Sequence, residues 1–281
     1  MKSRMKRSAY PYVIWMGIFI VIPLLLVLYF AITTGDSENF CTFTLSLDKF
    51  KRFLTPTYLK VLSKSINIAF LSTVLCVLLG YPMAFIISKE KPSRRNIMIL
   101  MFVIPMWMNF LLRTYAWMTI LGKTGFINFI VTKLGFAPLD LMYNDKAVLL
   151  GMVYNFVPFM VLPSYSVLVK IDKSLIDAAE ALGANKITVF RKVIITLSLP
   201  GIITGATMVF IPALSTFVIS SLLSGNKYTL IGNIIQQQFT QTGDWHFGSS
   251  MSVILMIFII ITMALTSKFD KEKEGEGGGL W

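Results

Sequence analysis

Charged side chains are scarce in this sequence. Asp, Glu, Lys and Arg together make up 14% of the 281 residues, whereas hydrophobic residues make up 55%. Soluble domains carry about a quarter charged residues. The deficit excludes an ordinary soluble domain, and the mean hydropathy of +0.71 agrees with that. The sequence therefore predicts a protein whose solvent is lipid.

Residues that build disulfides, metal sites and most active sites are also rare. The chain has two cysteines and one histidine. Cys41 lies in a polar loop and Cys76 in an apolar run, so we expect no disulfide between them. His246 has no cluster of potential ligands near it in the sequence. We expect no catalytic residue, no metal and no bound cofactor on this chain.

Six apolar segments are long enough to cross a membrane as helices, which takes about 20 residues. They predict an all-α membrane protein with spans over residues 12–32, 66–88, 97–121, 147–169, 200–223 and 249–267. Between the first two spans, Leu47, Phe50, Phe53 and Leu54 recur at helical spacing and predict a short amphipathic helix at the interface. Residues 268–281 are charged and then Gly-rich, so we expect a disordered tail.

Basic residues are distributed unevenly between the two sides of the predicted membrane. The net charge is +12. If the N-terminal residues 1–11 are cytoplasmic, the inside segments hold sixteen Lys and Arg residues and the outside segments hold nine. Because cytoplasmic loops carry the excess of basic residues, we predict that both termini are cytoplasmic. A nucleic-acid ligand fits this pattern less well, because the basic residues lie between apolar blocks and not along one face.

No Asp or Glu occurs within the six predicted spans, and Arg113 is their one ionisable residue. Carriers coupled to protons or ions usually need carboxylates or histidines at membrane depth. The energy for any transport must therefore come from elsewhere. Arg113, near Asn109 and Tyr115, either belongs to a translocation path or snorkels to the outer interface beside Trp117.

One short motif suggests nucleotide binding but lacks the required residues. Gly122-Lys123-Thr124 resembles the end of a phosphate-binding loop. That loop needs another Gly five residues before its second Gly, so that backbone N–H groups can wrap the phosphates. Trp117 occupies that position, and a predicted span precedes the triplet where a strand should be. We interpret the triplet as a turn and expect that this chain does not bind ATP.

The inside connection over residues 170–199 contains a short predicted helix. Ser174 followed by Asp177 is close to a capping box, which marks the start of a helix. Gly183 is placed to end the helix in the left-handed conformation. A small apolar face is shared by Leu175, Ala178, Ala179 and Leu182. Such a face suits docking into a groove of a partner protein, although it could also pack on the chain's own spans.

The same segment is similar to a motif of a known family. Asp177-Ala178-Ala179, Gly183 and the apolar stretch beyond look like the EAA loop of permease subunits in bacterial ABC importers. In that family the loop forms a coupling helix that fits a cleft of the ATPase subunit. The resemblance implies that the ATPase is contacted by Asp177, Ala178, Ala179, Leu182 and Gly183. The family usually has Glu at the position of Asp177 and proline at that of Thr196, which leaves the bend into the fifth span open.

The resemblance covers nearly the whole chain and is strongest to the spermidine/putrescine branch of this family. Matching stretches are Leu79-Gly80-Tyr81-Pro82, Ile104-Pro105-x-Trp107 through Arg113-x-Tyr115, Gly151-x-Val153-Tyr154 with Pro158-Phe159-Met160, Leu230-Ile231-Gly232-Asn233 and Asp244-Trp245-x-Phe247-Gly248. It implies the type I, MetI-like permease architecture in a bacterial cytoplasmic (inner) membrane. It also implies a second homologous permease as heterodimer partner, two ATPase subunits that carry ATP and Mg, and an external polyamine-binding protein.

The residues of a translocation path are less well defined. Gly201-x-x-x-Gly205 and Pro212 in the fifth span permit close packing and a kink near a pore. The candidates for the path are Asn109, Arg113, Tyr154, Phe210 and Phe217, three of them aromatic, because an aromatic face can hold a polyamine cation. Alternatives are an importer for an amino-acid derivative, sulfate or a metal–chelate, an ATP-independent channel or carrier, and a scaffold or receptor without transport.

Overall fold

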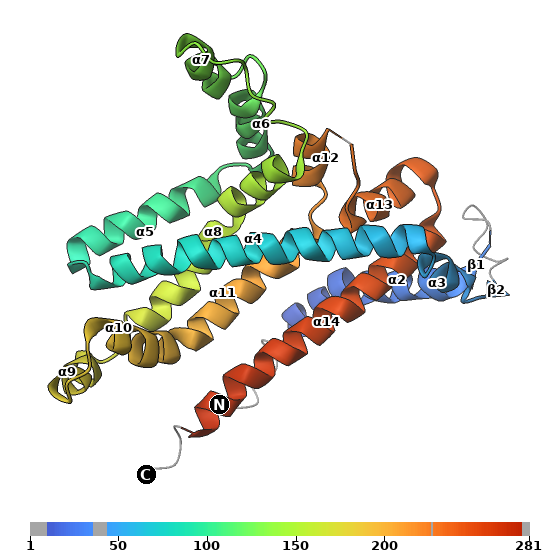
Figure 1. Ribbon diagram of the computed structural model, residues 1–281. Coiled ribbons are helices and arrows are strands. Elements are labelled where there is room, and N and C mark those ends of the chain that lie inside the picture. The colour runs from blue at the N-terminus through green and yellow to red at the C-terminus, as the bar shows by residue number, and fades with distance from the viewer. Residues whose placement is uncertain (1–9, 36–43, 226, 277–281) are drawn as a thin grey trace. The chain divides into compact units, whose positions relative to one another are not determined.

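The computed structural model describes residues 10–35, 44–225 and 227–276, which are almost entirely helical (Figure 1). The elements are η1 (Gly17–Val21), α2 (Ile22–Ile32), β1 (Thr33–Thr34), β2 (Thr44–Leu45), α3 (Asp48–Phe53), α4 (Pro56–Lys89), α5 (Pro92–Trp107), α6 (Phe110–Leu121), α7 (Phe126–Lys133), α8 (Asp145–Leu168), α9 (Lys173–Ala181), α10 (Lys186–Val189), η2 (Phe190–Ile194), α11 (Ile195–Ser215), α12 (Val218–Ser224), α13 (Ile231–Gln237), η3 (Gln238–Thr242) and α14 (Trp245–Glu276).

Five helices are long and apolar enough to cross a membrane. They are Tyr10–Ile32, Pro56–Lys89, Asp145–Leu168, Lys186–Ser215 and Trp245–Thr266. A sixth candidate is a helix pair, Pro92–Trp107 with Phe110–Lys133, bent by 94° at its break. The prediction of an all-α membrane protein is therefore confirmed, with five continuous spans and one bent pair.

The third predicted span, residues 97–121, is not one continuous helix, and this part of the prediction is wrong. α5 ends at Trp107, and the backbone is extended at Met108. Asn109 then caps α6, because its side-chain oxygen accepts a hydrogen bond from the Leu111 backbone N–H. An Asn at this position stabilises a new helix start. The break is therefore set by local capping, in a stretch that is apolar throughout.

Other span limits also differ from the sequence prediction. The fifth span begins at Lys186, before Pro200, and ends at Ser215, because Thr216 is extended and α12 starts a separate short helix. The second span begins at Pro56, well before residue 66. α14 continues to Glu276, so the predicted disordered tail is helical up to that residue. The Lys and Glu residues there favour helix. Residues 277–281 lie outside the described part.

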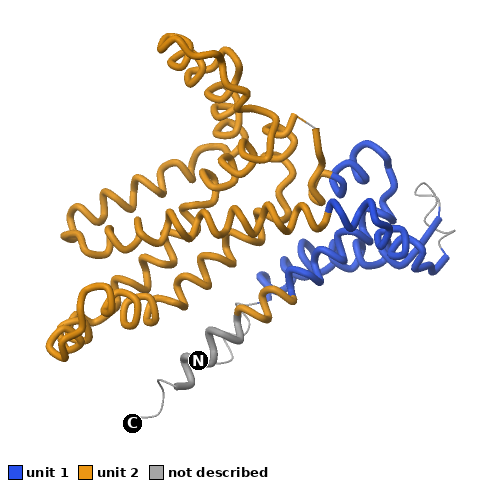
Figure 2. Tube along the Cα trace, in the orientation of Figure 1, with its two compact units in different colours: residues 1–61, 234–260 blue, residues 62–233, 261–281 orange. Residues whose placement is uncertain are grey.

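The chain forms two compact units, residues 1–61 with 234–260 and residues 62–233 with 261–281 (Figure 2). In the first unit, β1 pairs with β2 in antiparallel register, Thr33 opposite Leu45. The amphipathic helix predicted from the spacing of Leu47, Phe50 and Phe53 is present as α3, and Phe53 is its buried residue.

In the second unit, α4, α8 and α11 lie side by side and supply most of the core (Figure 1). α11 approaches α8 closely at Gly201 and Gly205, where a Cβ would lie 3.0 Å from the Pro163 carbonyl oxygen and 2.7 Å from the Met160 sulfur. The predicted tight packing of this glycine pair is therefore confirmed. The Tyr81 hydroxyl lies 2.8 Å from Ser198 Oγ and joins α4 to α11.

Candidate functional site

The predicted coupling helix is present as α9, but it starts at a different cap. Asp172 is the N-cap, and its Oδ1 accepts a hydrogen bond of 2.9 Å from the Ser174 backbone N–H. That hydrogen bond holds the pKa of Asp172 below its usual range. The predicted capping box of Ser174 with Asp177 is therefore wrong, because an Asp two residues earlier takes the cap and places Ser174 in the first turn.

The end of α9 agrees with the prediction. Gly183 has a φ of +83°, in the left-handed region that favours glycine. Its N–H donates to the Glu180 carbonyl at 2.9 Å, and the Ala184 N–H donates to the Ala179 carbonyl at 3.1 Å. These two bonds form a Schellman motif, which satisfies the last carbonyls and fixes where the helix stops.

The apolar face of α9 is left open by the rest of the chain. Leu182 is 90% exposed and Leu175 is 49% exposed. Asp177 and Ala178 are also exposed, whereas Ala179 is half-buried. Leu182 thus has almost no cover from the rest of the chain, whereas Leu175 and Ala179 are partly covered. A capped helix with an apolar face open to its surroundings is a ready contact surface for another protein.

A short connection, residues 182–185, joins α9 to the helix of the fifth span, and that helix is continuous. The Asn185 side chain accepts a hydrogen bond from the Thr188 backbone N–H and caps α10. From Lys186 the helix continues through the π-helical turn η2 into α11 and ends at Ser215. Thr196, at the position where the family usually has proline, lies within this continuous helix.

Two of the predicted path residues lie on α6. Asn109 is exposed and caps the helix. Arg113 is 8% exposed, and its buried Nε has no hydrogen-bond acceptor among the described residues. A buried guanidinium nitrogen without an acceptor is costly in a single chain. The interpretation in which Arg113 snorkels to the interface does not agree with this burial.

The aromatic path residues lie on other elements. Tyr154 on α8 is 37% exposed and contacts Trp117 of α6 edge to face, with ring centroids 5.3 Å apart. Phe217 is 41% exposed at the turn between α11 and α12, where its carbonyl accepts from the Asn233 side chain at 2.9 Å. That these residues share one path stays a prediction.

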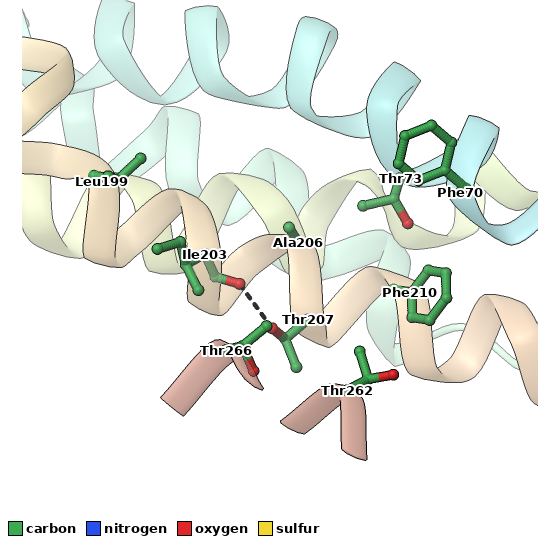
Figure 3. A pocket seen from close by; sticks show the side chains of 9 residues that line it. All are labelled: Phe70, Thr73, Leu199, Ile203, Ala206, Thr207, Phe210, Thr262 and Thr266. Carbon is green, nitrogen blue, oxygen red and sulfur yellow. Dashed lines mark hydrogen bonds between the residues drawn. The ribbon is translucent and has the colours of Figure 1, made fainter. Parts of the chain in front are cut away.

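Phe210 lines a groove of about 540 Å³ between α4, α11 and α14 (Figure 3). Three threonines of this groove donate their hydroxyl hydrogens to carbonyls of their own helices: Thr73 to Ala69, Thr207 to Ile203 and Thr266 to Met263. These bonds tie the threonine hydroxyls to their own helices. The open surface of the groove is apolar, with aromatic and aliphatic walls, and no charged residue lines it.

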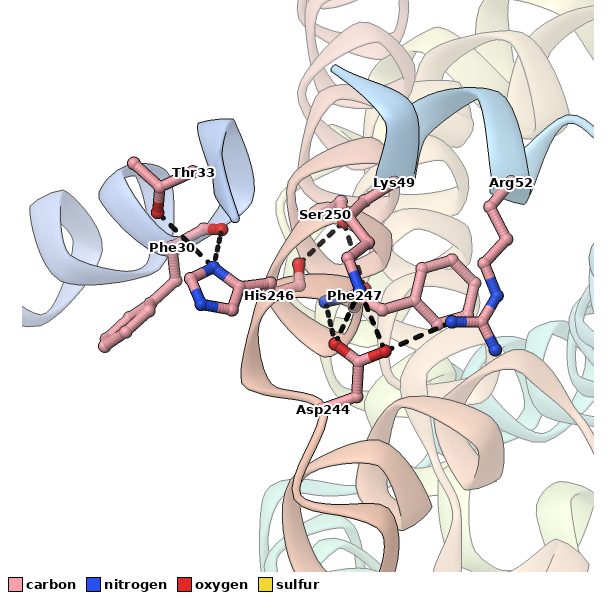
Figure 4. A network of polar contacts seen from close by, with 8 residues as sticks. All are labelled: Phe30, Thr33, Lys49, Arg52, Asp244, His246, Phe247 and Ser250. Atoms are coloured by element: carbon pink, nitrogen blue, oxygen red, sulfur yellow. Dashed lines mark hydrogen bonds and ion pairs between the residues drawn. The ribbon is translucent and has the colours of Figure 1, made fainter. Parts of the chain in front are cut away.

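A polar network at the start of α14 was not predicted as a site (Figure 4). Asp244 accepts from the Phe247 backbone N–H at 3.0 Å and pairs with Lys49 and Arg52 of α3, each at 3.1 Å. Burial raises the pKa of Asp244, but these three partners outweigh it and hold that pKa below its usual range. The network fixes α3 against the first turn of α14, and no sequence signal identifies the Lys and Arg partners of Asp244.

His246, beside this network, is buried and has a structural role. Its Nδ1 lies 3.1 Å from the Phe30 carbonyl oxygen and 3.3 Å from Thr33 Oγ1, which joins the end of α2 to α14 (Figure 4). Within the described ranges, no group of three or more His, Cys, Asp or Glu residues could hold a metal ion.

Comparisons with known proteins place these features in context. The model of the family described as binding-protein-dependent transport system inner membrane component matches residues 3–273. The chain is 36% identical over 259 residues to the spermidine/putrescine transport system permease protein PotB of Haemophilus influenzae, with 92% of this chain and 91% of that protein covered. The PotB protein of Escherichia coli is 38% identical over 245 residues, with 86% and 89% covered.

Solved structures share the fold at lower identity. A bacterial ABC transporter involved in the import of the acidic polysaccharide alginate matches with a TM-score of 0.74 at 14% identity, covering 94% of this chain and 95% of that one. The MetNI methionine ABC transporter, in an inward-facing conformation, matches with a TM-score of 0.56 at 18% identity, covering 76% and 94%.

Proposed function

The chain belongs to the family of binding-protein-dependent transport system inner membrane components, and we propose that it imports polyamines as a permease subunit of an ATP-driven ABC transporter. It is a non-catalytic, multi-pass membrane subunit. The similarity to two spermidine/putrescine permeases over most of the chain supports the polyamine substrate. The solved structures with other substrates are too distant in sequence to favour theirs.

The proposed coupling role rests on the observation that helix α9 is fixed at both ends and exposes an apolar side chain. Its ends are fixed by the Asp172 cap and by the hydrogen bonds around Gly183, and its apolar side chain Leu182 has no cover. We propose that Asp177, Ala178 and Ala179 dock in a cleft of an ATPase subunit, which binds ATP and Mg itself. Closure of two such ATPases would then move α9 and the helices attached to it.

The remaining partners follow from the family. We propose a heterodimer with a second, homologous permease, two ATPase subunits and an external polyamine-binding protein. Both termini and α9 are on the cytoplasmic side, as the excess of basic residues there supports. The first span, Tyr10–Ile32, has only 6% of its apolar window buried within this chain, so it is free to contact lipid or the second permease.

For the path we propose the groove that Phe210 lines, together with the exposed rings of Tyr154 and Phe217. A polyamine has apolar methylene segments between ammonium groups. The apolar walls of the groove suit the methylene segments, and the aromatic faces can hold the cations. Arg113 and Asn109 stay candidates for the outer part of this path, with Arg113 bound to a group that this chain does not supply.

Site-directed cross-linking tests the coupling claim. Leu182→Cys places a thiol on the open face of α9, while Leu134→Cys, 69% exposed next to α7, serves as the matched control. Cys41 and Cys76 are first replaced by serine or alanine. We expect Leu182→Cys to cross-link to the ATPase subunit and to react with maleimide only from the cytoplasmic side. The proposal is contradicted if the Leu182→Cys variant forms no cross-link to the ATPase subunit, or if its thiol is labelled from outside.

Uptake into vesicles tests the substrate. We expect radiolabelled spermidine to enter only with ATP and with the binding protein, and putrescine to compete, whereas sulfate and amino acids do not. Phe210→Leu should raise the spermidine concentration needed for half-maximal uptake, because leucine has no π face for the ammonium group. Phe129→Leu, at an exposed ring on α7, is the control and should leave uptake unchanged. Uptake that is independent of ATP rules the proposal out.

A further inference from the structure

A second groove, of about 480 Å³, lies where α4 and α8 end and α9 begins. Its floor is apolar and includes Leu168 and Ile194, which are 6% and 5% exposed. Phe85 of α4 and Ile176 of α9 also line it. The groove is therefore bounded by the ends of two membrane spans and by the first turn of the coupling helix.

Two lysines give this groove a positive mouth. Lys89 and Lys173 line it, and the Lys89 ammonium lies 4.3 Å from the centre of the Phe85 ring. No carboxylate is among the lining residues. Of the neighbouring acids, Asp172 caps α9 and Glu90 lies 3.8 Å from Arg94, while the exposed Asp177 lies one turn after Lys173 without an ion pair to it. Within the described part of the chain, neither lysine forms an ion pair. The groove thus offers two unneutralised cations above an apolar floor.

We propose that this groove binds an anionic phospholipid of the leaflet on the α9 side. The lysines suit a phosphate group, and the apolar floor suits the first part of an acyl chain. Basic pockets between spans on the cytoplasmic side are known to bind anionic head groups. A free anion would gain nothing from the walls formed by Phe85, Leu168 and Ile176. The assignment to the cytoplasmic leaflet rests on the proposed orientation, whereas the ligand chemistry does not.

A lipid in this position touches both α4 and α9. α4 is fixed there, because the Arg95 guanidinium donates to the Ser88 carbonyl at 2.9 Å and the Glu90 carbonyl at 3.2 Å and so holds the turn between α4 and α5. A phospholipid between Phe85 and Ile176 therefore braces the first turn of the coupling helix against a rigid span end. Its loss leaves that side of α9 without support.

The test uses the complete transporter, purified through this chain and placed in nanodiscs of phosphatidylcholine with or without phosphatidylglycerol. Native mass spectrometry counts the lipids that stay bound. The groove variant is Lys89→Gln with Lys173→Gln. The matched control is Lys186→Gln with Lys192→Gln, which removes the same charge from exposed residues on the same side outside the groove. Among the described residues none of these four lysines forms an ion pair, and Lys89 contacts the Phe85 ring.

We expect the groove variant to retain phosphatidylglycerol about thirtyfold less well, since each basic residue near the surface contributes about five- to sixfold. The control should retain it like the unchanged protein. An equal loss of phosphatidylglycerol in both variants overturns the proposal. Retention of phosphatidylcholine as strong as that of phosphatidylglycerol by the unchanged protein also overturns it. So does binding of glycerol phosphate as tightly as the intact lipid, which would make the groove a site for a free anion. The count needs neither ATP nor polyamine, so it stands apart from the cross-linking test.

Discussion

Replacing Gly183 by alanine changes how firmly the end of the proposed coupling helix is fixed, without removing a side chain that could contact the ATPase. Gly183 has a φ of +83°, and a Cβ added there would meet no atom within 4 Å. The cost of Gly183→Ala is therefore conformational, about 1–2 kcal/mol for a side chain held in the left-handed region. That cost lowers the population of the properly ended helix by about 5- to 30-fold relative to its frayed form. A nine-residue helix is marginal by itself, so this shift is large enough to affect function.

The chain supplies a matched control at Gly135. Its φ is +84°, and an added Cβ there also meets no atom within 4 Å. It ends α7 with the same pair of bonds, the Gly135 N–H to the Thr132 carbonyl at 3.0 Å and the Phe136 N–H to the Val131 carbonyl at 3.1 Å. Gly135→Ala therefore carries the same backbone cost at a helix that the proposal places on the opposite side of the membrane.

The assay is polyamine-stimulated ATP hydrolysis by the reconstituted transporter. We expect Gly183→Ala to reduce the stimulation by up to about thirtyfold without reducing the amount of assembled complex, and Gly135→Ala to leave it unchanged. Gly183→Asn should recover part of the loss, because asparagine tolerates the left-handed region. The reasoning is refuted if both alanine variants reduce stimulation equally, or if Gly183→Ala has no effect while Leu182→Cys still cross-links to the ATPase.

Three further predictions concern packing and charge. Gly205→Ala should destabilise the protein by about 1–3 kcal/mol in thermal unfolding, because its Cβ would lie 2.7 Å from the Met160 sulfur, whereas Gly17→Ala has open space and should be neutral. Tyr81→Phe should cost about 0.5–1.5 kcal/mol, since it removes the hydrogen bond to Ser198. The pKa of Asp244 is lowered in the folded protein, so its carboxylate stabilises the fold above the usual carboxyl range, and this stabilisation is lost as pH falls through the folded pKa. Asp244→Asn should therefore lower the melting temperature at neutral pH and much less in strong acid. An equal decrease of the melting temperature at both pH values would count against the ion pairs.

Hydrophobic length predicted the number and type of the spans, because crossing a membrane leaves few alternatives to a long apolar helix. It did not predict the break at Met108 and Asn109. A sliding average over residues 97–121 treats Asn109 as one polar residue in an apolar segment. Its ability to accept the Leu111 N–H and begin a new helix is a local effect that the average cannot express.

The fifth span was predicted to begin at Pro200, the first residue of its apolar window. A proline is tolerated in the first turn of a helix but removes a hydrogen bond from a helix interior. In the structure the helix already runs from Lys186 and passes through Pro200. Membrane helices tolerate prolines inside their length, since nearby hydroxyl groups and local changes of the hydrogen-bond pattern compensate. Ser198 and the π-helical turn η2 lie just before Pro200.

The presence of the short helix α9 could be predicted because its signals are local. Gly183, the small apolar face and the polar start all lie within a dozen residues. The candidate path could not be predicted as well, since Tyr154, Phe210 and Phe217 belong to different elements. Arg113 illustrates the limit, because the acceptor for its buried Nε is not among the described residues of this sequence.

The continuity of the helix after α9 gives the coupling proposal its mechanical basis. The uninterrupted helix from Lys186 to Ser215 has 30 residues, so at 1.5 Å per residue it is about 45 Å long and exceeds the thickness of the hydrocarbon core. It begins two residues after Ala184 completes the end of α9, and it carries Phe210 near its far end. Gly201 and Gly205 hold it against α8, so it cannot bend freely at its middle. We therefore expect a displacement that an ATPase imposes on α9 to pass through the short connection of residues 182–185 and then to reach the groove around Phe210 along this single helix.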